Sequence, residues 1–268
     1  MPVEYQQLLA DLHEESQVVD GLLSGLGPEA WCTPTPAQGW SVGDQVSHLA
    51  YFDDAAVMAA TDPDQFEVDA CALMAQGPDF PDDVADLFRS LTAAELLDWF
   101  RTARGGLLEV FATVEPRTRV PWYGPSMSAA SAVTARLMET WAHGQDIADA
   151  VGADYPATLR LRHIAHLGVR TFGFSFELKG LEIPTAVVRV SLVAPDGTRW
   201  EWGDPNALES VSGPALDFCL VVTQRRHPDD TGLVTNGPVG ARWLSLAQAY
   251  AGPSGAGRTP GGLSNERH

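Results

Sequence analysis

The feature that most constrains the fold is a change of hydropathy period between the two halves of the 268-residue chain. In the first half, apolar side chains recur every three or four positions through long stretches, which is the period of an amphipathic α-helix. In the second half, the run Ala186–Val193 is β-branched and alternates, which is the period of a half-buried strand. This change predicts an α+β protein whose helices and strands lie in separate parts.

Residues 1–155 are predicted to form an antiparallel four-helix bundle. Long helices are expected over residues 3–26, 41–60, 92–114 and 126–151. The second and third begin at Ser41 and Thr92, each followed three positions later by a carboxylate, which is the pattern of a capping box. Residues 61–91 are acidic and contain several prolines, so a long connection with short helical pieces is expected there. Four helices with one long connection are typical of an antiparallel bundle.

Residues 156–252 are predicted to form a smaller α+β domain. A helix is expected over residues 158–178, followed by a β-hairpin whose strands flank the turn signal Asp196-Gly197. Beyond the hairpin, a helix, a short strand and a second helix are expected over residues 213–226, 233–235 and 238–250. Residues 253–268 begin with a run rich in glycine and proline, and a disordered tail is expected there.

The composition excludes several classes of protein. The chain has 35 acidic and 17 basic residues, a formal net charge of −18, so binding to nucleic acid or to an anionic membrane is not expected. Its three cysteines form no CxxC pair, which excludes a disulfide scaffold and a cysteine-rich zinc site. No run approaches the roughly 18 apolar residues of a membrane span, and the first residues do not resemble a signal peptide. A globular cytoplasmic protein is expected.

Glu139 and His143 form the strongest candidate site. Their spacing of four places both side chains on one face of a helix, about 5–6 Å apart, which suits two ligands of one metal ion. His48, in the middle of the second helix, is the candidate third ligand, and Asp146 is expected to orient His143 or to supplement the ligands. Two histidines and a carboxylate leave coordination positions open, as in catalytic zinc sites, although iron, nickel or manganese also fits. The alternative interpretation is a helix-surface pair with a separate core histidine.

Two segments carry a resemblance to a known family. Gly39–Leu49 (GWSVGDQVSHL) and Met138–Asp146 (METWAHGQD) resemble the DinB-like, or YfiT-like, metal-binding bundle superfamily. Within it the chain is most similar to the mycothiol-dependent maleylpyruvate isomerases of actinobacteria. The resemblance implies a metal bound by His48, Glu139 and His143. The second half, including residues 194–197 and 217–226, resembles a branch known only as metal-binding.

The resemblance also implies an activity. A small thiol, mycothiol, would be the co-substrate, and the enzyme would catalyse S-transfer to, or isomerisation of, a small electrophilic metabolite. An arginine of the second domain is expected to face the metal and hold an anionic group, which favours Arg226 or Arg225; the alternative is a solvated helix end. Trp122, Tyr123 and Met127 are expected to line the mouth of the site, or else to be ordinary packing residues.

Two other activities remain open from the sequence. The first is a metal-dependent hydrolase or lyase that activates water and needs no thiol. The second is a non-catalytic protein whose second domain has a sterol-carrier-like fold and binds a small apolar molecule. In each case Trp40 is expected to anchor the start of the second helix in the core, and Cys219 is expected to pack in the core without a chemical role.

Overall fold

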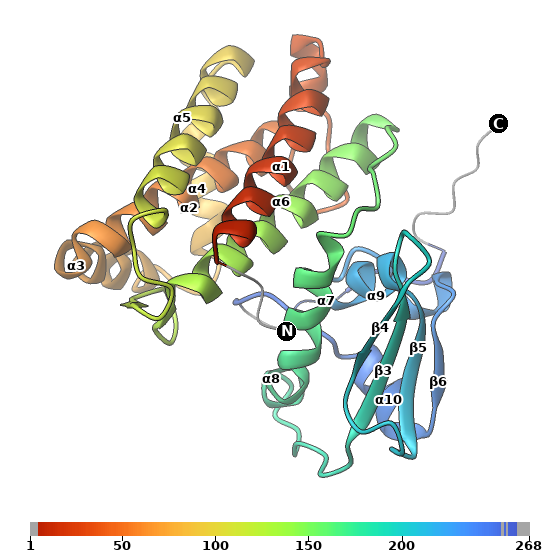
Figure 1. Cartoon of the computed structure of the whole chain (residues 1–268). Coiled ribbons are helices and arrows are strands. Elements are labelled where there is room, and N and C mark those ends of the chain that lie inside the picture. The colour runs from red at the N-terminus through yellow and green to blue at the C-terminus, as the bar shows by residue number, and fades with distance from the viewer. Residues whose placement is uncertain (1–4, 253–254, 256, 262–268) are drawn as a thin grey trace. The chain divides into compact units, whose positions relative to one another are not determined.

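The computed structural model describes residues 5–252, 255 and 257–261 (Figure 1). The chain divides into two compact units, Met1–Tyr155 and Pro156–His268. The first is helical and the second combines helices with a four-stranded sheet, which confirms the α+β class. Among the described residues, none of the helices has the length and hydropathy needed to cross a membrane.

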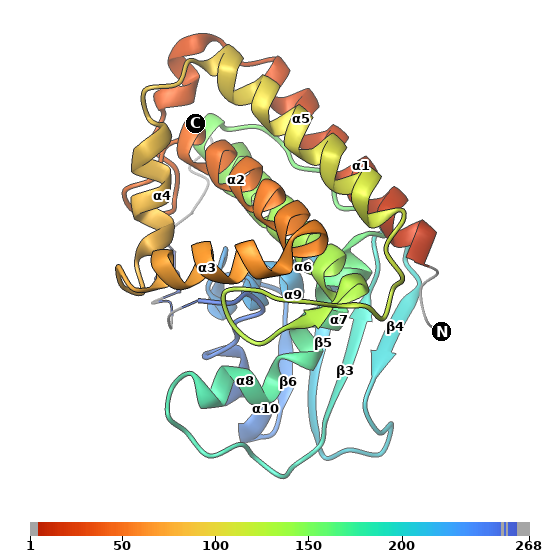
Figure 2. The same cartoon turned by 90° about the vertical axis from the view of Figure 1, so that its left-hand side faces the viewer.

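The first unit is the predicted bundle. Its four long helices are α1 (Tyr5–Ser24), α2 (Val42–Thr61), α5 (Ala93–Phe111) and α6 (Ala129–Val151). Helices α1 and α2 each pack against both α5 and α6 (Figure 2). Each of the four helices contributes a fully buried leucine: Leu12, Leu49, Leu107 and Leu137.

Local hydrogen bonds fix where these helices begin. Both predicted capping boxes are present: the Asp44 carboxylate accepts from the Ser41 N–H at 2.7 Å, and the Glu95 carboxylate accepts from the Thr92 N–H at 2.8 Å. A short 3₁₀ turn, η1 (Pro28–Cys32), precedes α2. Because the cap sets the first turn of α2, it also sets which residues of that helix face the bundle interior.

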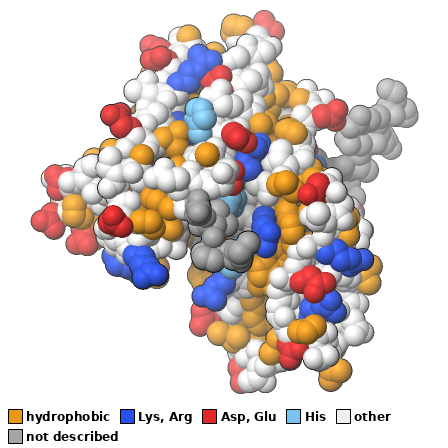
Figure 3. All heavy atoms as spheres, in the orientation of Figure 1, with side chains coloured by type: hydrophobic (Ala, Val, Ile, Leu, Met, Phe, Trp, Pro, Cys, Tyr) orange, Lys and Arg blue, Asp and Glu red, His pale blue; other side chains and the backbone are white. Residues whose placement is uncertain are grey.

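The long connection carries two helices, α3 (Pro63–Met74) and α4 (Phe80–Phe88). The apolar face of α3 packs on α2 through Phe66 and Ala70, while its other face is exposed and acidic, as the space-filling view shows at its left edge (Figure 3). Residues 117–125 are not helical. They include the short strand β1 (Arg119–Val120), which pairs with β2 (Met127–Ser128).

The second unit is built on a sheet of order β4-β3-β5-β6. The predicted hairpin is present as β3 (Val188–Val193) and β4 (Arg199–Trp202). Strand β5 (Glu209–Pro214) pairs parallel to β3, and β6 (Val234–Asn236) pairs antiparallel to β5. The helices are α7 (Leu161–Arg170), α8 (Phe172–Glu177), α9 (Ala215–Val222) and α10 (Pro238–Leu244), with a 3₁₀ turn, η2 (Pro228–Asp230).

The two faces of the sheet differ. Val190, Leu192 and Val211 are fully buried on the face covered by α9 and α10. The opposite face is polar and carries the 2.9 Å ion pair between Arg189 and Glu201 on neighbouring strands. This division explains the alternation in the sequence, because successive side chains of a strand point to opposite faces.

Three predicted helices of the second unit are shorter than expected. The helix over residues 158–178 is divided at Thr171 into α7 and α8. The helix expected from residue 213 starts at Ala215, because β5 extends to Pro214, and it ends at Val222. Gln224 has φ 61°, and the Arg225 N–H donates to the Leu220 carbonyl at 2.7 Å, so the chain reverses there. The last helix ends at Leu244 instead of reaching residue 250.

The predicted disordered tail, residues 253–268, lies partly outside the described residues. Of those that are described, Gly255 donates from its N–H to the Gln248 side chain at 3.1 Å, and Gly261 donates to Asp230 at 2.9 Å. These described glycines therefore contact earlier residues of the second unit.

Candidate metal centre

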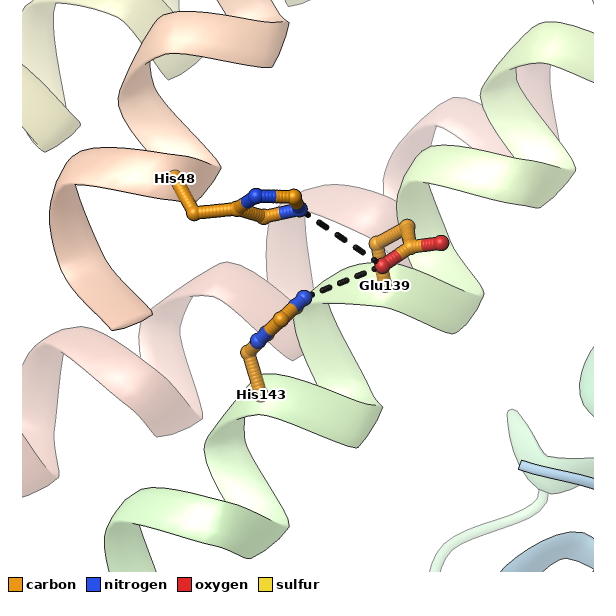
Figure 4. A group of neighbouring side chains, drawn as sticks. All are labelled: His48, Glu139 and His143. Atoms are coloured by element: carbon orange, nitrogen blue, oxygen red, sulfur yellow. Dashed lines mark hydrogen bonds and ion pairs between the residues drawn. The ribbon is translucent and has the colours of Figure 1, made fainter. Parts of the chain in front are cut away.

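His48, Glu139 and His143 lie together between α2 and α6 (Figure 4). The Glu139 Oε2 atom is 3.0 Å from His143 Nε2 and 3.9 Å from His48 Nε2. One ligand atom from each residue lies within 4.8 Å of the other two. The structure therefore brings together the three residues that the sequence selected.

The sequence places these side chains through simple helix geometry. Glu139 and His143 are one turn apart on the inner face of α6. His48 projects from the second turn of α2, which packs against α6. The position of His48 depends on the capping box of Ser41 and Asp44, because that cap fixes the start of α2.

Burial and mutual contact set the charges of the site. Burial, followed by the nearby His143, lowers the pKa of His48 from 6.5 to about 3, although Glu139 opposes this change. For Glu139, burial acts to raise the pKa, but hydrogen bonds with His143 and His48 outweigh it and hold the pKa well below its ordinary value of 4.5. A neutral imidazole and an ionised carboxylate are the forms that coordinate a metal ion.

The donor set fits a single divalent ion. Imidazole nitrogen and carboxylate oxygen bind zinc at about 2.0–2.2 Å, so donors around one ion lie roughly 3–4 Å apart. The measured separations of 3.0 and 3.9 Å agree with this spacing. The same donors suit iron, nickel and manganese, so the donor set is compatible with a divalent metal and favours no particular element.

Gln45 holds the ring of His143, a role that the sequence analysis did not assign to it. The Nδ1 atom of His143 contacts the Gln45 Oε1 atom, and the Gln45 amide donates to the Thr35 hydroxyl at 2.8 Å. Both ring nitrogens of His143 are thus occupied, by Gln45 and Glu139. Asp146, expected in this role, is buried one turn further along α6. Gln45 lies three positions before His48 on the same helix face, which was the signal available for finding it.

Trp40 forms a wall of the site and is only partly buried, which corrects the expectation that it anchors in the core. Its ring is stacked on His143, with centroids 5.9 Å apart and planes 13° apart, and lies 5.2 Å from the ring of His48. Its indole N–H donates to Asp82 at 2.6 Å. Trp40 also lines a cavity of about 670 Å³ together with Ser47, the residue that precedes His48.

A second buried cluster lies about one turn away along the same two helices. Asp53, with 0% exposure, accepts from Arg104 at 2.6 Å and from Arg136 at 2.8 Å. Arg136 also donates to the carbonyl of Leu49, and Arg104 donates to Thr140. The cluster therefore ties α2, which carries His48, to α6, which carries Glu139 and His143.

The aromatic residues that were expected at the mouth of the metal site are separated from the ring of His48 by Phe52. Trp122 and Tyr123 pack in an aromatic cluster with Phe52, at centroid distances of 6.2 and 5.4 Å, and Phe52 in turn lies 4.5 Å from His48. Burial raises the pKa of Tyr123 above its ordinary value of 10. Met127 is in β2 and pairs with Val120. Their predicted contact with a substrate stays a prediction.

Arg225 and Arg226 belong to the second unit and follow the reversal after α9. Arg225 donates to the Thr223 carbonyl at 2.7 Å, and Arg226 donates to the Arg225 carbonyl at 2.8 Å. Cys219, as expected, is fully buried in α9, and burial raises the pKa of its thiol. The proposed role of the arginines in binding an anion stays a prediction.

Comparison with known proteins identifies the family. Residues 12–148 match the mycothiol maleylpyruvate isomerase N-terminal domain, and the chain belongs to that family. The matched segment contains His48, Glu139 and His143. Two uncharacterized proteins of Mycobacterium tuberculosis, one from each of two strains, are 45% identical over 250 residues, which cover 93% of this chain and 97% of each relative.

A solved structure shares the fold. The crystal structure of the mycothiol-dependent maleylpyruvate isomerase aligns with a TM-score of 0.59 and 16% identity, over 87% of this chain and 93% of that chain. A histidine-to-alanine mutant of that enzyme gives the same values. This likeness covers both units and confirms the order of a helical domain followed by an α+β domain.

Proposed function

We propose that this protein is a metal-dependent enzyme that uses a low-molecular-weight thiol, mycothiol, in the isomerisation of a small electrophilic metabolite or in S-transfer to it. The observation that carries the proposal is the contact between His143 and Glu139. If the Nδ1 atom of His143 donates its hydrogen to Gln45, the Nε2 lone pair faces a carboxylate oxygen at 3.0 Å. Two acceptors at this distance need a cation between them, either a second proton or a metal ion.

The residues of the triad have distinct tasks in this proposal. A divalent ion held by them supplies a positive charge that lowers the pKa of a bound thiol and leaves coordination positions open. His48 stays neutral because of its burial, so it offers a lone pair at neutral pH. Glu139 contributes one negative charge, and Gln45 fixes the orientation of the His143 ring.

The chemistry requires no protein nucleophile. In an isomerisation, the thiolate sulfur forms a bond to one carbon of a conjugated double bond, rotation follows about the resulting single bond, and the same C–S bond then breaks. The double bond is restored and the thiolate is released, so there is no net change in atoms or oxidation state. In S-transfer the C–S bond is kept and a leaving group departs with its electron pair. Cys219, the buried cysteine of the second unit, has no role in these steps.

Two properties of the site support a small-molecule substrate. Trp40, whose ring contacts both histidines, also lines a cavity of about 670 Å³ whose lining, among the described residues, includes none of the three triad residues, and this volume is within the usual size of about 300–1,000 Å³ for small-molecule pockets. The family and the solved structure that shares the fold are both named after a mycothiol-dependent isomerase. Maleylpyruvate is accordingly the first substrate to test, with other electrophilic alkenes conjugated to a carbonyl next.

The test is cobalt substitution followed by titration with mycothiol. We expect visible absorption bands from bound cobalt, and a new near-ultraviolet thiolate-to-cobalt band when mycothiol is added. Both signals should be lost in His143→Ala and kept in His13→Ala, which removes an exposed histidine of α1. Turnover of maleylpyruvate should require the thiol.

Other results would assign a different function. Cobalt binding without any spectral response to mycothiol, together with thiol-independent turnover of an ester or amide, would replace the proposal with a water-activating hydrolase or lyase. Absence of cobalt binding would reject the metal centre and leave a binding protein.

A further inference from the structure

The second unit contains a cavity of its own, of about 390 Å³. It lies between the end of α7, helix α8, the segment before β3 and α10, and Figure 2 shows α8 and α10 side by side at this place. Ile183 and Val187 line it and keep 40% and 57% of their surfaces exposed. Large aliphatic side chains left exposed around a hollow mark a surface that binds another molecule. The volume is that of a small-molecule site.

A buried donor at this cavity has no partner. Trp243 lines the cavity and is 0% exposed, yet its indole Nε1 has no hydrogen-bond partner among the described residues. An unpaired buried donor costs about 1–3 kcal/mol. The ring of Phe172 packs edge-on against the indole at 5.2 Å and holds it in place. The indole is therefore a fixed aromatic part of the cavity lining, and its N–H is buried away from the cavity surface.

A cation without a counter-charge lines the same cavity. Arg170, the last residue of α7, is exposed, and within the described part of the chain its guanidinium has no ion-pair partner. Among the described residues, no carboxylate lines the cavity. The other ionisable side chains of α7 are Arg162, His163 and His166, so the helix carries no negative charge. In a chain with a net charge of −18, this local positive field favours an anionic ligand.

We propose that this cavity binds a small apolar monocarboxylate. The apolar body would lie against Ile183 and Val187, and the carboxylate would pair with Arg170. One cation and an apolar lining describe this class of ligand more closely than a neutral lipid or a phosphate. The site is independent of the metal centre, because every residue that lines it belongs to the second unit.

The test is calorimetric titration of the full-length chain with decanoate and, in parallel, with 1-decanol, which has the same alkyl chain and no charge. A chelator keeps the metal centre empty, so that decanoate is not bound there. We expect saturable binding of decanoate, weakened about tenfold or more in Arg170→Gln, because a charge-assisted pair is lost. Decanol binding should change less than twofold. Arg199→Gln, an exposed arginine of β4 outside the cavity, is the matched control and should bind decanoate normally.

Two further variants separate ligand binding from folding. Val187→Glu places a like charge at an exposed position of the lining and should abolish binding of decanoate while leaving the melting temperature unchanged. His143→Ala should bind decanoate as the unaltered protein does.

Three outcomes would overturn the proposal. The first is the absence of saturable decanoate binding at millimolar concentration. The second is equal affinity in Arg170→Gln, which would show that the cation does not recognise the ligand. The third is a concentration-dependent dimer that Val187→Glu abolishes, which would assign the cavity to a second copy of the chain.

Discussion

Two clusters of charged side chains lie about one helical turn apart between α2 and α6, and they differ in how completely they are satisfied. In the Asp53 cluster each carboxylate oxygen accepts from an arginine, and the arginines also bond Leu49 and Thr140. In the triad, His48 has a buried Nδ1 without a partner among the described residues, and one carboxylate oxygen of Glu139 contacts both histidines. A satisfied cluster stabilises the fold, whereas an incomplete one is a candidate binding site.

The largest effect is expected from breaking the satisfied cluster. Asp53→Asn leaves two buried arginines without their counter-charge, and the free energy of unfolding should fall by about 3–5 kcal/mol. The control is Asp54→Asn, which removes the neighbouring exposed carboxylate and should cost less than about 1 kcal/mol. Urea denaturation of both variants measures the difference. Equal losses would show that the Asp53 cluster has no special role in stability.

The opposite result is expected for the triad. Glu139→Gln removes the charged ligand, so the affinity for zinc should fall by more than about 100-fold, beyond the range for residues that only orient ligands. The unfolding free energy of the metal-free protein should fall by less than it does in Asp53→Asn, because no buried arginine loses its counter-charge. A competition assay with a zinc-binding dye, using Glu109→Gln as control, measures the affinity. Unchanged affinity would remove Glu139 from the ligand set.

A smaller effect is expected from the residue that orients His143. Gln45→Met keeps the size of the side chain and removes the acceptor for Nδ1, so zinc affinity should fall by about 10–100-fold. The exposed Gln65→Met is the matched control. If Gln45→Met binds zinc normally while Asp146→Asn does not, Asp146 is the orienting residue, as the sequence analysis predicted.

The smallest effect concerns the acid sensitivity of the metal-free protein. The pKa of His48 is about 3 in the folded protein and 6.5 in the unfolded chain. At a pH between these values, the unfolded chain therefore binds a proton that the folded protein does not. Stability therefore falls as the pH decreases from about 6.5 toward 3. His48→Gln should reduce that slope by up to about 1.4 kcal/mol per pH unit. Identical slopes in both proteins, measured by denaturation with a chelator present, would contradict the buried neutral state of His48.

Local signals in the sequence predicted the parts of the molecule that depend on neighbouring residues. The capping boxes of Ser41 and Thr92, and the spacing of Glu139 and His143, act within one or two turns of helix, and all are present as predicted. The convergence of His48 with the other two followed from the bundle and from family resemblance, because spacing alone does not show which helix faces meet.

Contacts between distant residues account for what the sequence did not reveal. Gln45 reaches His143 across 98 positions, and Arg136 reaches Asp53 across 83, so neither contact leaves a periodic trace. Strand β5 was read as loop and helix because its run, ESVSGP, is polar and includes glycine and proline. Its pairing with β3 stabilises it in spite of that composition.

The parallel pairing of β3 with β5 has a consequence for the order of folding. Because β4 lies between them in the chain but at the edge of the sheet, the segment after β4 must cross the start of β3 before β5 can pair on its other side. The sheet is complete only when Asn236 has been synthesised, whereas the bundle and its candidate metal centre are complete at Val151. Helical units with local contacts also fold faster than such sheets. During synthesis the metal centre is therefore expected to assemble before the second unit has a fold.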